Sequence, residues 1–368
     1  MASAAGSSLT NMNVVVPVFS LAGAASAAWA ARAVLARHDG DVRAWAVRFL
    51  TGPGRTSRLL LLLFMALNLK SLPFAWTARI FCALIRHTLW PRKPLPLPAL
   101  FHYSITRSRT SLLETDYNFH KSNSTYFADL DASRTHLVMY LLGPGFAAVG
   151  RNASTKIVRS PADGVTPMAG SLGVGLGAVF CSFRKEIAPY QPYEMWSRVL
   201  AWDRKWLYIV THFVVKGKVR PASWDGRSRQ GGPTAQKAWT AADEANLQKY
   251  VIATAVSKYV FKLGRFTVHP SYLIEASGLL PTRPGDGWRG GGPEAVGTVD
   301  DADEAELMSE SPTPTTDSES DGETWTWKNV ERERRRGMAL AGQFAALDDA
   351  GALFDGGKNG ALGIFGPG

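Results

Sequence analysis

SLLETDYNFHKSNSTYF, residues 111–127, is the stretch of sequence that decides the fold. It begins at the end of an apolar run typical of a strand and finishes in a Ser/Asn cluster that can cap a following helix. Between the two lie the carboxylates Glu114 and Asp116 and the histidine His120. A carboxylate placed before a helix can attack a substrate or activate water, while the free N–H groups of the first helical turn hold a developing oxyanion. The stretch therefore predicts a hydrolytic site at the start of a helix.

A long helix is predicted over residues 123–142, directly after this stretch. Its apolar residues recur at steps of three and four, which gives one face for a core; they are Tyr126, Phe127, Leu130, Leu137, Val138 and Leu141. The sequence Gly-Pro-Gly at residues 143–145 predicts the end of the helix.

Five further segments have the composition and alternation of strands, and they are residues 101–113, 174–186, 193–202, 205–216 and 250–262. Hairpin-type connections join the later ones. This order predicts an α+β fold in which an antiparallel five-stranded sheet wraps around one long helix. Residues 205–216 are apolar on both faces, so we expect the outer face of the sheet to be buried in a homodimer.

The N-terminal part predicts contact with a membrane. Residues 1–31 contain no charged side chain, residues 14–31 are mostly apolar, and arginines follow them. Residues 59–90 mix leucines and aromatic residues with basic ones, as an interfacial helix does. We therefore expect a membrane-associated protein whose remaining chain faces the cytoplasm. A cytoplasmic protein with a loose N-terminal tail, and with residues 59–90 packed on the next domain, is the alternative.

These patterns predict a division of the chain into four parts. Residues 1–90 form a hydrophobic and amphipathic segment, and the proline-rich PRKPLPLP at residues 91–98 separates it from a domain at residues 99–280. Residues 281–323 are first Gly-rich and then acidic, which predicts a disordered linker. Residues 324–368 form a helical extension whose basic cluster, Arg332, Arg334, Arg335 and Arg336, is expected to be a solvated face.

The composition limits the partners. The net charge is +10, and residues 293–323 hold 11 acidic residues and no basic one, so the rest of the chain carries a larger positive charge. That part suits an anionic membrane surface or a phosphate-bearing ligand such as coenzyme A. Nucleic acid is not expected, because no recognition-helix, zinc-finger or RNP pattern is present. Two cysteines cannot form a disulfide framework, and no Cys/His cluster has zinc spacing. Neither a metal nor another cofactor is predicted.

The residues around Asp116 resemble a known family. The pattern Glu114-x-Asp116-x-x-x-His120-x-x-Asn123-x-x-Tyr126 is similar to the D-x-D-x-x-G-H-x-N-N-x-x-Y signature of hot-dog-fold thioesterases of the 4-hydroxybenzoyl-CoA type. The run up to Arg134, the segment at residues 257–265 and Asn68-Leu69-Lys70 resemble the thioesterase-like proteins of fungal secondary-metabolite pathways. Three departures stand out: Glu114 replaces the first Asp, Phe119 replaces Gly, and Ser122 replaces an Asn.

The resemblance implies a hot-dog fold and the hydrolysis of an acyl-CoA or a carrier-bound acyl thioester. It assigns Asp116 as nucleophile or general base and a backbone N–H near Asn123 as the oxyanion donor. His120 would shape the site or bond near the carboxylate, and Ser122 and Tyr126 would contact the substrate. A bulky Phe119 would narrow access to the backbone N–H groups.

Other interpretations stay open at this point. Asp116 can merely cap the helix, and His120 can be a structural histidine. An enoyl hydratase or dehydratase on the same fold uses a D-x-N-P-[LI]-H pattern, which residues 116–120 approach without the proline. A non-catalytic acyl-binding or membrane-adaptor protein is a third reading, and it predicts acyl-CoA binding without turnover.

Overall fold

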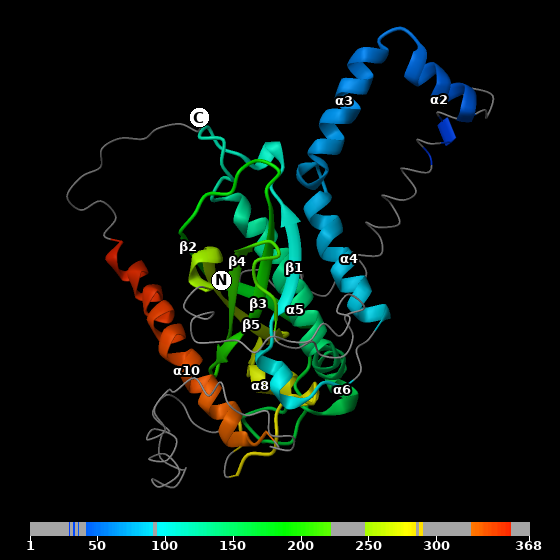
Figure 1. Ribbon diagram of the computed structural model, residues 1–368. Coiled ribbons are helices and arrows are strands. Elements are labelled where there is room, and N and C mark those ends of the chain that lie inside the picture. The colour runs from blue at the N-terminus through cyan, green and yellow to red at the C-terminus, as the bar shows by residue number, and fades with distance from the viewer. Residues whose placement is uncertain are drawn as a thin grey trace.

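The computed structural model describes residues 42–90, 94–221, 247–284, 287–289 and 325–354, with the single residues 29, 32, 33 and 36. A long helix, α5 (Thr125–Gly150), lies against the inner face of an antiparallel sheet (Figure 1). The strands are β1 (Ser104–Arg109), β2 (Leu172–Phe183), β3 (Pro192–Trp202), β4 (Trp206–Val215), β5 (Val251–Leu263) and β6 (Phe266–Val268). Their order is β1-β3-β4-β5-β2, and the short β6 pairs with β5. This confirms the predicted hot-dog arrangement, with one small strand added.

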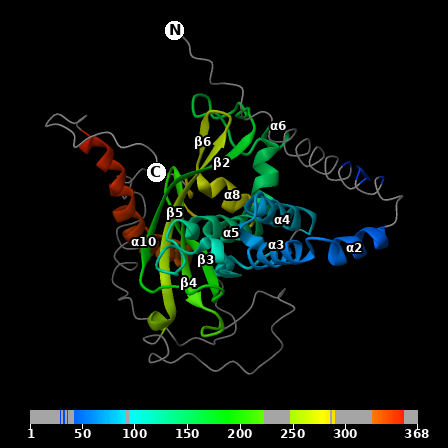
Figure 2. The ribbon, with the colours of Figure 1, turned by 90° about the horizontal axis from the view of Figure 1, so that it is seen from above.

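The other helices lie around this unit in layers. Figure 2 shows α10 on one side of the sheet and α5, then α4 and α3, on the other. Their bounds are α2 (Val42–Thr51), α3 (Arg55–Leu67), α4 (Ala75–Leu89), α6 (Asn152–Thr155), α8 (Pro270–Ala276) and α10 (Trp327–Ala345). Short 3-10 turns join them at Leu69–Ser71, Leu97–Phe101, Leu112–Glu114, Gln248–Tyr250 and Ala346–Leu353.

The inner face of the sheet and α5 form the main core. Leu137, Leu141 and Leu142 of the helix pack against Ile209 and Phe261 of the strands, all of them buried. The three- and four-residue spacing that predicts the helix is the spacing of these contacts. At the other end of α5, Tyr126 and Leu130 pack into a second cluster on the same face.

The predicted end of α5 is wrong, because the helix continues through Pro144 to Gly150. Helix α8 packs against this point so closely that a Cβ on Gly145 would lie 2.1 Å from the carbonyl oxygen of Leu273. The N–H of Gly145 donates to Ser277 Oγ at 3.0 Å. Tertiary packing therefore stabilises a helical turn that the local sequence disfavours.

The predicted first strand is also too long. Only Ser104–Arg109 is strand, with a 3-10 turn on each side. A proline starts the first of these turns, and a capping box between Ser111 and Glu114 starts the second. Local capping thus ends the strand before the apolar pair Leu112 and Leu113.

Helix α10 covers part of the outer face of the sheet. Ala341 of the helix packs with Leu200, Tyr208 and Val210 of β3 and β4. The chain's own C-terminal extension thus lies where we expected a second copy of the protein. The basic cluster on α10 is only partly a solvated face, since Arg334 and Arg335 bind the buried Glu331 at 2.8 Å each.

Replacing Gly337 with alanine is expected to destabilise the protein by about 1–3 kcal/mol. The new Cβ would lie 1.9 Å from the carbonyl oxygen of Leu200, so α10 would have to move away from β3. Gly342→Ala on the same helix is the control, because nothing lies within 4 Å of its Cβ position. The control should be neutral or stabilising through helix propensity. Denaturant unfolding of both variants makes the comparison, and equal effects would contradict the described packing.

The membrane-associated, cytoplasm-facing location predicted above is corrected here. None of the helices in the described part of the chain is both long enough and apolar enough to cross a bilayer. The apolar run at residues 14–31, apart from Trp29, and most of the acidic linker at residues 281–323 lie outside the described residues. The division of the chain into four parts stays a prediction.

A histidine pair joins α4 to α5. His87 Nε2 lies 3.0 Å from His136 Nδ1, and Tyr140 packs edge-on against His87. Burial, His136 and Arg86 lower the pKa of His87 from 6.5 to about 4, and burial with Arg86 also lowers the pKa of His136. Both rings are therefore neutral in the folded protein at neutral pH.

The free energy of unfolding should fall as the pH drops from about 6.5 to about 4. Because the pKa of His87 is lower in the folded state, the unfolded chain takes up protons first in this window. Above about pH 6.5 the ring is neutral in both states and this stabilisation is fully present. Denaturant unfolding from about pH 7.5 to about pH 4.5 measures the slope. His87→Gln should reduce the slope without abolishing it, because burial also lowers the pKa values of His212 and His269 to about 4. An unchanged slope would show that the pair is not responsible.

Candidate functional site

Asp116 lies in the turn before α5, where it is the first residue after Thr115. A bridge between Thr115 and Lys121 closes this turn, and the N–H of Asp116 donates to the carbonyl of His120 at 2.9 Å. Asp116 Oδ1 accepts from the N–H of Asn118 at 2.9 Å, and the side chain is half-buried. The carboxylate therefore has one local bond and remains accessible to solvent.

Phe119 in this turn has a left-handed backbone, with φ of 60°. This conformation favours glycine, which explains why the thioesterase signature has Gly at this place. The Phe119 side chain is 71% exposed, so it points into solvent. This protein thus keeps the left-handed backbone at position 119 although the residue there is not glycine.

The structure places the predicted site residues in two environments. His120 Nε2 lies 3.0 Å from Glu186 Oε2, Ser122 Oγ lies 3.1 Å from Ser124 Oγ, and Asn123 is exposed. These residues share the turn and the start of α5 with Asp116. Tyr126 is instead buried at 1% exposure, and its ring packs on Phe183 and Phe213. The catalytic and binding roles of all five residues stay predictions.

The first turn of α5 offers backbone donors. The N–H of Thr125 donates to the carbonyl of Ser122 at 3.0 Å, and the N–H of Tyr126 donates to that of Asn123. Within the described residues, the N–H groups of Asn123 and Ser124 donate to no other group. Two amide hydrogens at a positive helix end are the arrangement that stabilises an oxyanion.

Beneath this turn lies a buried ion cluster of Lys70, Arg79, Glu114, Lys121 and Asp129. Asp129 on α5 is completely buried, and its carboxylate lies 2.8 Å from Lys70 Nζ, 2.9 Å from Arg79 Nη2 and 3.0 Å from Lys121 Nζ. Glu114 lies 2.9 Å from Lys70 Nζ and 3.3 Å from Lys121 Nζ. The cluster joins α4 and the turn after α3 to α5 and to the turn that carries Asp116.

The two lysines of the cluster differ in their hydrogen bonds. Lys70 Nζ also donates to the carbonyl of Arg109 at 3.2 Å and to the hydroxyl of Tyr193 at 3.1 Å, and Tyr193 donates to Asp129. Lys121 Nζ is fully buried yet makes no well-aligned hydrogen bond in the described part of the chain. We therefore regard Lys121 as held by charge at its two short distances rather than by directed bonds.

Burial and the neighbouring charges shift the pKa values of Asp129, Lys70 and Tyr193. Burial alone would raise the pKa of Asp129, but Lys70, Lys121 and Arg79 outweigh it and hold this pKa well below its usual value. Burial lowers the pKa of Lys70, with Lys121 adding to the effect and Asp129 opposing it. Burial and Asp129 raise the pKa of Tyr193 far above its ordinary value, so its hydroxyl stays a neutral donor.

Sequence reasoning missed this cluster. Its members lie in four separate segments of the chain, and no spacing rule connects Lys70 with Asp129. One signal pointed to it, because Asn68-Leu69-Lys70 belongs to the family resemblance. Asn68 is buried, its side chain accepts from the N–H of Leu113 at 2.9 Å, and it positions Lys70 beside the turn. Among the described residues, no group of three or more His, Cys, Asp and Glu side chains is placed to hold a metal ion.

Comparison with known proteins gives the family. The model of the "Thioesterase-like superfamily" matches residues 111–241. The chain is 34% identical to "Probable thioesterase atnL" of Emericella nidulans, over 86% of this chain and 92% of that protein. It is 37% identical to "Thioesterase poxG" of Penicillium oxalicum, over 58% of this chain and 68% of that protein.

A solved structure, the probable thioesterase YbaW of Escherichia coli, is 9% identical and covers 48% of this chain and 96% of its own, with a TM-score of 0.28. The assignment rests on the relative atnL, whose alignment covers 86% of this chain, and agrees with the strand order and central helix described above. The chain belongs to the thioesterase-like superfamily.

Proposed function

We propose that this protein hydrolyses an acyl thioester, carried by coenzyme A or by a carrier protein, with Asp116 as nucleophile or general base. The observation that carries the proposal is the place of Asp116, a solvent-accessible carboxylate in the turn that leads into α5. The free N–H groups of Asn123 and Ser124 would polarise the thioester carbonyl as it is attacked. The names of the relatives atnL and poxG support this reaction class.

The proposed roles of the neighbouring residues follow from their contacts. His120 bonds to Glu186, so it would orient the turn and contribute to the wall of the site. Ser122 and Asn123 would contact the substrate at the helix start. Tyr126 would act from the core by fixing the first turn of α5, because its ring is enclosed by Phe183 and Phe213. The pathway served would be one of fungal secondary metabolism, as the resemblance implies.

Thiol release from a panel of acyl-CoA and acyl-pantetheine substrates tests the reaction. We expect saturable release with a thiol-reactive dye and no change in the conjugated absorbance of an enoyl-CoA. Hydration of the enoyl-CoA without thiol release would replace hydrolysis by hydratase chemistry. Tight acyl-CoA binding with no turnover of any member of the panel would identify a binding protein.

We also propose that the protein is a homodimer that pairs along β2. This strand is an edge of the sheet, bonded to β5 on one side, and its Val174, Leu176 and Phe180 are each exposed by 46–47%. An exposed apolar edge strand is a surface that proteins normally cover. Phe183 and Glu186 lie at its end beside Tyr126 and His120, so pairing here would place a second copy near the turn of Asp116.

Leu176→Lys is expected to convert the dimer into monomers, because a charge at the edge of the sheet opposes pairing. Light scattering on a gel-filtration column gives the mass directly. The control is Leu340→Lys on α10, away from β2; this leucine is 60% exposed, against 46% for Leu176. A monomeric wild-type protein, or a dimer that survives in the Leu176 variant and dissociates in the Leu340 variant, would contradict this interface.

A further inference from the structure

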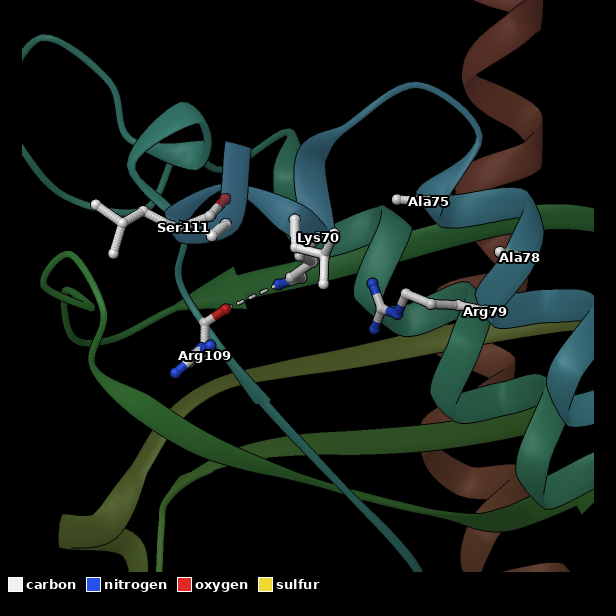
Figure 3. A pocket seen from close by; sticks show the side chains of 9 residues that line it. Lys70, Ala75, Ala78, Arg79, Arg109 and Ser111 are labelled. Carbon is white, nitrogen blue, oxygen red and sulfur yellow. Dashed lines mark hydrogen bonds between the residues drawn. The ribbon is translucent and has the colours of Figure 1, made fainter. Parts of the chain in front are cut away.

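A cavity of about 400 Å³ lies where α3 ends and α4 begins, beside the end of β1 (Figure 3). One part of its wall is apolar and consists of Ala66, Leu67, Leu69, Ala75 and Ala78. The other part is polar and consists of Lys70, Arg79, Arg109 and Ser111. Among the described residues, three cationic side chains and no acidic one thus line this space. Its volume is in the range that small-ligand sites occupy.

The charges behind the cavity do not balance. The buried ion cluster contains three cations, Lys70, Arg79 and Lys121, against two carboxylates, Glu114 and Asp129. Both carboxylates are at most 8% exposed and lie behind the cavity wall. A buried excess of positive charge is costly unless another anion neutralises it. One negative charge entering from the cavity would complete the cluster.

Arg79 is the residue placed to receive that charge. Its Nη2 lies 2.9 Å from Asp129 Oδ1, and its side chain is 27% exposed. A guanidinium has five N–H donors, and within the described residues Arg79 has no second partner. Figure 3 shows the Arg79 side chain extending from α4 toward Lys70 across the cavity. Lys70 already bonds to four groups, so it adds charge while Arg79 keeps donors for a ligand.

The apolar wall indicates the rest of the ligand. Leu67 and Leu69 are 46% and 67% exposed, and the leucines of α3 at residues 59–63 are exposed as well. Such a surface suits a hydrocarbon chain that starts in the cavity and leaves along α3. A carboxylate suits the polar end, because the cluster lacks one negative charge and a guanidinium can bind a carboxylate with two parallel hydrogen bonds.

We propose that this cavity is a binding site for an apolar-chain carboxylic acid, with the carboxylate on Arg79 and the chain on the wall of Leu67, Leu69 and Ala78. The site is separate from the turn of Asp116 and does not depend on the proposed reaction. Occupation would tie α3 and α4 more firmly to the domain, because the ligand bridges the end of one helix and the first turn of the other. The protein would thereby respond to the level of this free acid.

Calorimetric titration of the full-length protein with decanoate tests the proposal. We expect saturable binding of decanoate, and binding of 1-decanol and of acetate weaker by about tenfold or more, because each lacks one half of the ligand. Arg79→Gln should weaken decanoate binding by about tenfold or more. Arg86→Gln, which removes the same charge from an exposed position farther along α4, should leave it unchanged.

Two further variants separate the possible outcomes. Leu69→Glu places a carboxylate in the cavity from an exposed position, so it should abolish decanoate binding even if Arg79→Gln folds poorly. Asp116→Asn should bind decanoate normally, whatever the thiol-release assay gives. Loss of binding in the Asp116 variant with retention in both cavity variants would assign the acid to the turn before α5 and overturn the proposal. Equal affinity for decanoate and 1-decanol would also overturn it.

Discussion

Asp129→Asn is expected to lower the free energy of unfolding by about 3–5 kcal/mol. The amide has nearly the size of the carboxylate, so the change removes charge while leaving the packing of α5 in place. Three cations lie within 3.0 Å of this carboxylate, and it is completely buried. After the change Lys70, Arg79 and Lys121 would face Glu114 alone. Breaking a buried pair by removing one partner is costly because the remaining charge stays away from water.

The control for this prediction is Glu275→Gln. Glu275 binds Arg289 at 2.6 Å, a shorter contact than any in the buried cluster, but both side chains are more than one third exposed. An exposed pair contributes at most about 1 kcal/mol. Denaturant unfolding of the two variants therefore compares the same chemical change in two environments. Similar losses for both would mean that the cluster is hydrated and does not hold the fold together.

Asp116→Asn is expected to reduce thiol release by at least about 100-fold while leaving the unfolding midpoint unchanged. The amide oxygen of asparagine can still accept from the N–H of Asn118, so the turn should keep its shape. What the variant lacks is a group that attacks the thioester or takes a proton from water. A loss of activity without a loss of stability would therefore locate the chemistry on this carboxylate.

A second aspartate provides the matched control. Asp163 caps another exposed turn, where its Oδ1 accepts from the N–H groups of Val165 and Thr166. Asp163→Asn makes the same substitution in the same kind of turn far along the chain, and turnover should stay at the wild-type level. Wild-type turnover in Asp116→Asn would leave Asp116 with a capping role only. The acyl-chain titration described above would be unaffected by that result.

The strands and the central helix were predictable because each has a strong local signal. Alternation identifies β3 and β4, and the apolar spacing of α5 reports its contacts with the sheet directly. The predictions that were wrong concern places where contacts with distant segments determine the local structure. Pro144 stays helical because α8 packs on Gly145, and nothing near Pro144 in the sequence announces α8.

The site divides in the same way. The turn around Asp116 is continuous in sequence, and a signature of a few residues describes it. Lys70 and Asp129 lie 59 residues apart and meet only when α5 and the turn after α3 are packed together. The cover on the outer face of the sheet also depends on a distant segment, because α10, which follows the acidic linker in the sequence, packs on Leu200 and Tyr208. Local sequence patterns predict each segment separately, so they do not predict which distant segments are in contact.

The position of Lys70 decides how this enzyme can be shortened for experiments. The proline-rich spacer at residues 91–98 looks like a natural place to start a recombinant catalytic fragment. A fragment starting there would lack Lys70 and Arg79. The buried carboxylate of Asp129 would then keep only Lys121 of its three cationic partners. Cloning boundaries should therefore lie upstream of Asn68, so that the preparation retains the basic residues that neutralise its interior.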